Sequence, residues 1–187
     1  MGMSIEEYRK IVLKEDNKKP KYQLRGKVNH DLGKNFEDRI EAICEIYEMN
    51  NLAKIEKTPE PMKILKHIEN GHFETVFTKS AQPDFKGTKK GGKTIVFDAK
   101  FTELDKINYA VLSDFQRETL IKYKNLGAEA FVLVGFISGN IYKIDIDIWN
   151  NMKEQFGRKY IKEDELINLN CKANLDKNGI INFLDLN

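Results

Sequence analysis

The spacing of hydrophobic residues divides this chain into segments with the period of a helix and segments with the period of a strand. Apolar residues three and four positions apart predict a helix over residues 36–49. A second helix is expected to begin at Ser113 or Asp114 and to end at Gly127. A shorter helical pattern covers residues 163–169 near the end of the chain.

Strands are predicted where apolar and polar residues alternate with a period of two. The segments with this alternation are residues 52–57, 73–79, 94–100 and 141–146. Residues 130–136 are apolar throughout, which is typical of a strand buried on both faces. Residues 102–110 have mixed polarity and predict a loop. The order of these elements predicts a mixed sheet flanked by helices, in the α/β or α+β class.

The beginning of the chain differs from the rest in its pattern. Residues 1–32 are polar, with Pro20, Gly26 and scattered charges. We therefore expect residues 1–32 to form a loosely held N-terminal arm. The helix over residues 36–49 is expected to begin after it, with Asn35 as N-cap.

Composition limits the possible partners and compartments of the protein. A chain of 187 residues is long enough for one domain with its own core. Its formal net charge is only +2, so contact with nucleic acid would require a local basic patch. The two cysteines, Cys44 and Cys171, have no metal-ligand spacing and fit a reducing cytoplasm. No apolar run has the length of a membrane span, so we expect no membrane association.

Two carboxylates and one lysine give the chain its candidate chemistry. Asp98 and Lys100 are two residues apart in a predicted strand and therefore share a face. Asp84 precedes the turn signal Gly91-Gly92, and a hairpin there could bring Asp84 beside Asp98. Paired carboxylates suit Mg²⁺ or Mn²⁺, and a neighbouring lysine can stabilise charge on a phosphate. The same spacing also occurs on ordinary solvated strands.

Further segments resemble the RecU-type Holliday junction resolvases of the PD-(D/E)xK nuclease superfamily, in the same order along the chain. They are residues 33–37, 52–64, 77–87, 97–100, 115–116 and 157–161. The resemblance implies a restriction-endonuclease-like mixed central sheet flanked by helices, with residues 33–187 as a single nuclease domain. It also implies a cytoplasmic, homodimeric endonuclease that uses Mg²⁺, with Mn²⁺ as a substitute. Such an enzyme would resolve four-way DNA junctions in recombination by paired symmetric nicks.

The resemblance also implies roles for individual residues. Asp84 and Asp98 would be the metal ligands, and Lys100 would contact the scissile phosphate or the attacking water. Glu37 would approach the metal site from the first helix, and Gln116 would lie near Lys100 or a metal-bound water. Four lysines are candidate DNA contacts: Lys63, Lys79, Lys86 and Lys89.

Each of these roles has a simpler alternative. Glu37 could merely stabilise the dipole of a helix that begins near Asn35, and Gln116 could be an exposed helical glutamine. Asp98 stands where the family usually has Glu, and residues 64–77 are shorter than the family's projecting stalk, which leaves the strictness of four-way specificity open. For the whole chain, the alternatives are a related nuclease that acts on duplex or other branched DNA and a non-catalytic junction-binding accessory.

Overall fold

A five-stranded mixed sheet forms the centre of the molecule. The computed structural model describes residues 21–59, 62–67, 72–77, 82–175 and 180–184. In sheet order, the strands are β1 (Ala53–Lys57), β4 (Phe85–Lys89), β5 (Thr94–Thr102), β7 (Glu129–Phe136) and β8 (Ile141–Asp145). Only the β5–β7 pair is parallel, and the other neighbours are antiparallel. The predicted mixed sheet flanked by helices is therefore confirmed.

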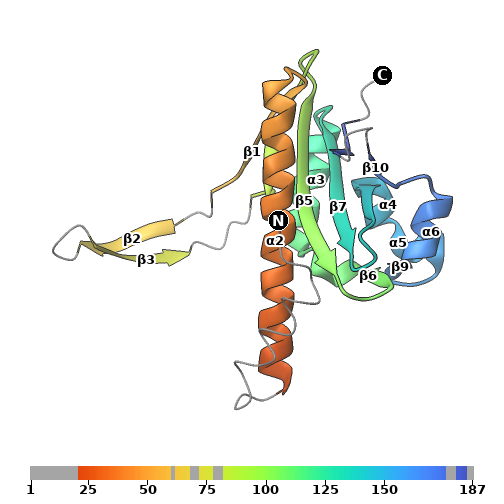
Figure 1. Ribbon diagram of the computed structural model, residues 1–187, viewed down its shortest axis with the longest axis horizontal. Coiled ribbons are helices and arrows are strands. Elements are labelled where there is room, and N and C mark those ends of the chain that lie inside the picture. The colour runs from red at the N-terminus through yellow and green to blue at the C-terminus, as the bar shows by residue number, and fades with distance from the viewer. Residues whose placement is uncertain (1–20, 60–61, 68–71, 78–81, 176–179, 185–187) are drawn as a thin grey trace.

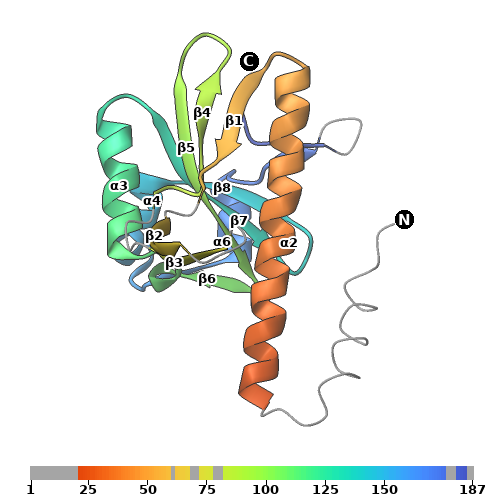
Figure 2. The same cartoon turned by 90° about the vertical axis from the view of Figure 1, so that its left-hand side faces the viewer.

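Helices cover both faces of this sheet (Figures 1 and 2). The long helix α2 (Lys21–Met49) packs on one face, where Ile40 and Phe97 belong to one buried cluster. The other face carries α3 (Asp114–Asn125) and α4 (Ile146–Asn150), and Leu120 belongs to a second buried cluster with Val96. Neighbouring residues of β5 thus point into opposite cores, as the period of a strand requires. None of the described helices has the length and apolar character needed to cross a membrane.

Short elements extend the domain at its edges. Two further helices are α5 (Met152–Phe156) and α6 (Glu163–Asn168). The small strand pairs are β2 (Met62–His67) with β3 (Phe73–Phe77), β6 (Lys106–Asn108) with β9 (Tyr160–Lys162), and β10 (Asn174–Leu175) with β11 (Ile181–Asn182). The β2–β3 pair projects away from the five-stranded sheet (Figure 1). A 3₁₀ helix, η2 (Tyr109–Val111), links β6 to the start of α3.

Two sequence predictions were wrong about local structure. Helix α2 begins at Lys21, so it passes through Asn35, and Leu32 is buried within it. Residues 21–32 are therefore helical rather than a loose arm, and residues 1–20 lie outside the described residues. The predicted loop over residues 102–110 contains β6 and η2. Strand β6 pairs with β9, which lies far ahead in the chain, and a local pattern does not show such a contact.

Two glycines allow the layers to approach closely. A Cβ on Gly135 would lie 2.6 Å from a ring carbon of Phe36, so α2 can rest on β7 only without a side chain there. A Cβ on Gly87 would collide with the backbone of Lys54 in β1. This close approach holds β1 against β4, the strand that follows the predicted metal ligand Asp84.

Candidate active site

The turn between β4 and β5 sets the position of the first two acidic residues. Gly91 and Gly92 have φ angles of 92° and 88°, in the left-handed region that glycine adopts without strain. The hairpin register pairs Phe85 with Phe97. The residue before Phe85 therefore lies beside the residue after Phe97, which confirms that the hairpin brings the two predicted ligands together.

Asp84 is fixed at this place by the backbone on both sides. Its Oδ2 accepts a hydrogen bond of 3.0 Å from the amide of Ala99 in β5. Its carbonyl accepts a hydrogen bond of 2.8 Å from the amide of Thr58, which follows β1. These bonds leave the Asp84 side chain at the edge of the site, where it is 23% exposed, whereas Asp98 is fully buried.

Lys100 connects the two carboxylates. Its Nζ lies 3.1 Å from Asp84 Oδ2 and 3.3 Å from Asp98 Oδ1. The Lys100 side chain is 19% exposed, so the ammonium is sheltered but reachable from solvent. A cation between two anions reduces their repulsion, and an ammonium here is also placed to meet a negatively charged phosphate.

Gln116 is held against Asp98 by the start of helix α3. Ser113 is the N-cap, and its amide and hydroxyl both donate to Gln116 Oε1 at 3.0 Å in a capping box. This arrangement leaves Gln116 Nε2 free to donate to Asp98 Oδ1 at 2.7 Å. Gln116 is therefore half-buried and donates a hydrogen bond into the site. The alternative of an exposed helical glutamine is wrong.

Burial and charge shift the acid–base behaviour of the group. Burial raises the pKa of the Asp98 carboxyl to about 7; Lys100 lowers this pKa and Asp84 raises it. Burial by itself lowers the pKa of Lys100, but Asp98 and Asp84 raise it above its ordinary value overall. Ionisable groups whose pKa values are perturbed by burial and by specific charge partners, as those of Asp98 and Lys100 are, are typical of functional sites.

The donor set fits a hard divalent cation. Asp98 Oδ2 is buried and has no hydrogen-bond partner among the described residues, so a buried carboxylate oxygen is left for a further ligand. Carboxylate oxygens are the ligands that Mg²⁺ and Mn²⁺ prefer. Within the described chain, no three His, Cys, Asp or Glu side chains gather to form a complete cage. The fit is therefore with an ion that keeps several waters, as Mg²⁺ does.

Glu37 lies in α2 and is paired with a residue that the sequence did not single out. Its Oε2 lies 3.0 Å from Nζ of Lys57, at the end of β1, opposite Phe85. Glu37 is in the interior of α2, so stabilisation of a helix N-terminus does not explain it. Its predicted approach to the metal stays a prediction, since its described contact is with Lys57.

The four lysines predicted to contact DNA have different surroundings. Lys63 belongs to β2 opposite Val76, and Lys79 lies outside the described residues. Lys86 donates to the side-chain oxygen of Gln82. The Lys89 ammonium forms an ion pair with Glu129 and donates to the carbonyl of Leu184 at 2.9 Å. Lys89 thus already has partners within the protein, and its contact with DNA stays a prediction.

Three further residues shape the site, and sequence reasoning missed two of them. Lys57 holds Glu37, and Ser113 orients Gln116. Thr58 donates its amide to the Asp84 carbonyl, and its Oγ1 is buried without a partner in the described chain. The N-cap pattern did reveal Ser113, but the roles of Lys57 and Thr58 depend on the packing of β1 beside β4.

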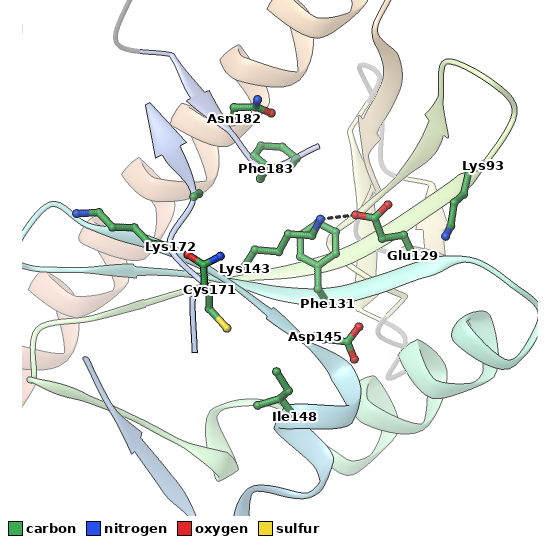
Figure 3. A pocket seen from close by; sticks show the side chains of 12 residues that line it. Lys93, Glu129, Phe131, Lys143, Asp145, Ile148, Cys171, Lys172, Asn182 and Phe183 are labelled. Carbon is green, nitrogen blue, oxygen red and sulfur yellow. Dashed lines mark hydrogen bonds and ion pairs between the residues drawn. The ribbon is translucent and has the colours of Figure 1, made fainter. Parts of the chain in front are cut away.

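A cavity of about 430 Å³ lies apart from this group. Figure 3 shows its lining side chains, among them Lys143 with its ion pair to Glu129, and Phe183 from the C-terminal segment. None of the residues predicted for catalysis or metal binding lines this cavity. The candidate active site is therefore the group around Asp98 and not this cavity.

A mixed sheet that presents Asp84, Asp98 and Lys100 from adjacent strands has the arrangement expected of the PD-(D/E)xK class. The RecU family, described as recombination protein U, matches residues 31–187, and the chain belongs to this family.

Two Bacillus relatives agree with this assignment. A Holliday junction resolvase RecU from Bacillus subtilis is 30% identical over 149 residues, which cover 72% of this chain and 68% of the relative. One from Bacillus cytotoxicus is 31% identical over 147 residues, covering 72% of each chain. Among solved structures, Archaeoglobus fulgidus Hjc, a Holliday junction resolvase, matches with a TM-score of 0.46 and 14% identity over 72% of this chain and 92% of its own.

Proposed function

We propose that this protein is a metal-dependent endonuclease that resolves four-way DNA junctions by paired symmetric nicks. The observation that carries the proposal is the contact of Lys100 with both Asp84 and Asp98 in a chain of the RecU family. Its Bacillus relatives are named Holliday junction resolvases. Branched DNA is accordingly the substrate class that we assign to this site.

The side chains have separate tasks in this reaction. Asp84 and Asp98 would hold a Mg²⁺ ion, with Mn²⁺ as a substitute, and the bound ion would supply Lewis-acid chemistry and a more acidic water. Asp98 must be deprotonated for this, and the hydrogen bond from Gln116 favours its charged form. Lys100 places a positive charge where negative charge develops on the phosphate, which is the usual way in which proteins stabilise such a transition state.

The β2–β3 hairpin is the element that we expect to reach the centre of the junction. It pairs with no strand of the five-stranded sheet and projects from the domain (Figure 1). Met62 and Leu65 of β2 are each 58% exposed. Exposed apolar side chains on a projecting ribbon favour contact with a partner, and unstacked bases offer such a surface.

Symmetric nicking also requires two copies of the site. One domain carries one Asp84–Asp98–Lys100 group. Two equivalent cuts in a twofold-symmetric junction need two such groups related by a twofold axis. We therefore propose that the active form is a homodimer.

The experiment that tests the function compares two aspartate variants on a synthetic four-way junction with Mg²⁺. Asp84→Asn removes a charge from the site, whereas Asp105→Asn removes one from an exposed residue outside it. We expect Asp84→Asn to lower the cleavage rate by about 100-fold or more while junction binding is kept, because it weakens charge stabilisation during chemistry. Asp105→Asn should cut like the wild type. Normal cutting by Asp84→Asn would show that the site is misassigned.

A further inference from the structure

A surface groove lies at the start of helix α3, beside the candidate active site. Its volume is about 660 Å³. The residues that line it come from η2, the first turn of α3 and the segment before β9: Asn108, Tyr109, Ala110, Val111, Leu112, Ser113, Asp114, Arg117 and Lys159. None of these residues was assigned a role in cleavage.

An aromatic ring with two cations forms one wall of the groove. The Arg117 guanidinium lies 4.1 Å from the centroid of the Tyr109 ring, and the Lys159 ammonium lies 5.3 Å from it. The backbone of Tyr109 is tied to the same segment, since its amide donates to the Lys159 carbonyl at 2.9 Å. The ring is therefore held in place between helix α3 and the segment before β9.

The two cations differ in burial and in the partners that already bind their charges. Arg117 is buried, donates to the Leu112 carbonyl and forms an ion pair with Asp114, so its charge is already used inside the protein. Lys159 is exposed, and the described part of the chain offers it no ion pair. Its long side chain can leave the ring and bind an incoming anion.

The groove is connected to the active site by a short chain of hydrogen bonds. Ser113 lines the groove and donates to Gln116 Oε1. Gln116 in turn donates to the Asp98 carboxylate at 2.7 Å. A group bound in the groove is thus separated from Asp98 by only two side chains.

We propose that this groove binds one unstacked nucleotide of the DNA strand next to the scissile phosphate. Its base packs on the ring of Tyr109 and on Val111, and its phosphate binds Lys159. The assignment rests on the proposed function, because it takes the scissile phosphate to lie at Asp84, Asp98 and Lys100. It goes beyond that function by naming a nucleotide subsite and the residues that form it.

The chemistry of the lining favours a nucleotide over other ligands. An aromatic ring and Val111, which is 42% exposed, offer apolar surface to a base face. The ammonium of Lys159, which has no ion pair among the described residues, supplies the charge that a phosphate requires. A base costs least to unstack where its pairing is already disrupted, and we expect such bases beside the crossover of a junction.

The test is a binding cycle without metal, in which cleavage plays no part. Four-way junctions carry a single abasic site at successive positions around the crossover, and affinity is measured for the wild type and Tyr109→Leu. At one position the abasic site should weaken wild-type binding by about 5- to 100-fold, the range expected for one base–aromatic stack. Tyr109→Leu should bind the intact junction as weakly as the wild type binds that abasic junction. Its affinity should fall no further when the junction carries the abasic site. Tyr109→Phe should behave like the wild type.

The lysine is tested by its salt dependence. Lys159→Ala should lower the slope of log affinity against log salt by about one, because one phosphate contact is lost. The matched control is Lys153→Ala, which removes an exposed lysine of α5 that does not line the groove and should keep the slope.

Two outcomes would overturn the nucleotide subsite alone, and a third would overturn the proposed function as well. Independent losses from Tyr109→Leu and the abasic site would overturn the subsite, as would unchanged binding by Tyr109→Leu and Lys159→Ala. Either result leaves the proposed function standing if Asp84→Asn still abolishes cutting. A wild type that binds no junction would overturn both.

Discussion

Replacing Gln116 by alanine tests whether the helix α3 cap and the active site are one hydrogen-bonded unit. The Gln116 amide has two functions in the structure. Its oxygen accepts two hydrogen bonds from Ser113, and its nitrogen donates to Asp98 at 2.7 Å. Gln116→Ala removes all three bonds, whereas Ser113→Ala removes the hydroxyl of the cap and leaves the Asp98 bond available.

The cap and the hydrogen bond to Asp98 each contribute a different amount to the free energy of unfolding. Loss of the Ser113 cap should cost about 1 kcal/mol of the free energy of unfolding. A hydrogen bond to a charged carboxylate contributes about 1.5–3 kcal/mol, and Asp98 is fully buried, so water cannot replace the lost donor. Gln116→Ala should therefore be less stable than Ser113→Ala by about 1.5–3 kcal/mol.

Urea unfolding measures this difference, followed by circular dichroism at a pH above the Asp98 pKa of about 7, where the carboxylate is charged. A double-mutant cycle of Gln116→Ala with Asp98→Asn isolates the bond between the two side chains. The coupling should be lost from the cycle of Ser113→Ala with Asp98→Asn. If Gln116→Ala and Ser113→Ala lower stability equally, Gln116 is only a capping residue and the reasoning is refuted.

Three further predictions concern packing, pH and charge. Gly135→Ala should lower the free energy of unfolding in urea by about 1–3 kcal/mol, because its Cβ would lie 2.6 Å from the Phe36 ring. Gly33→Ala, in helix α2 with open space around it, should raise that free energy by about 0.5–1 kcal/mol. Equal effects of the two substitutions would contradict the close approach of α2 to β7. Hydrogen bonds lower the pKa of Glu163 despite its burial, so its contribution to stability is present above the ordinary glutamate pKa and is lost as pH falls through the lower folded pKa. The urea midpoint of Glu163→Gln should therefore approach that of the wild type in acid, and a constant gap between them would argue against this coupling. Lys100→Ala should depress junction cleavage far more than it lowers the unfolding midpoint, and a parallel loss of both would make Lys100 a structural residue only.

Local patterns in the sequence predicted the centre of the site. Strand alternation placed Asp98 and Lys100 on one face, and the glycine turn brought Asp84 beside them. Both features depend on residues close together in sequence, so a period of two and a turn signal were sufficient. A helix was likewise predicted to begin at Ser113 or Asp114, and Ser113 is its N-cap.

Features that depend on distant contacts were missed. The start of α2 was misplaced because Asn35 has the local signature of a cap, whereas the helix continues to Lys21. The ion pair of Lys89 was missed because its partner, Glu129, lies at the start of β7, far away in the sequence. The ion pair between Glu37 and Lys57 joins helix α2 to the end of strand β1, and the spacing of residues along the sequence does not predict it.

Cleavage of a synthetic four-way junction and of a matched linear duplex, each with and without Mg²⁺, tests the proposed function most directly. We expect paired symmetric nicks in the junction only when Mg²⁺ is present, with the duplex left intact. Equal cutting of both substrates would contradict junction resolution and indicate a nuclease of broader specificity. Tight junction binding with no cutting in Mg²⁺ or Mn²⁺ would contradict catalysis by Asp84, Asp98 and Lys100.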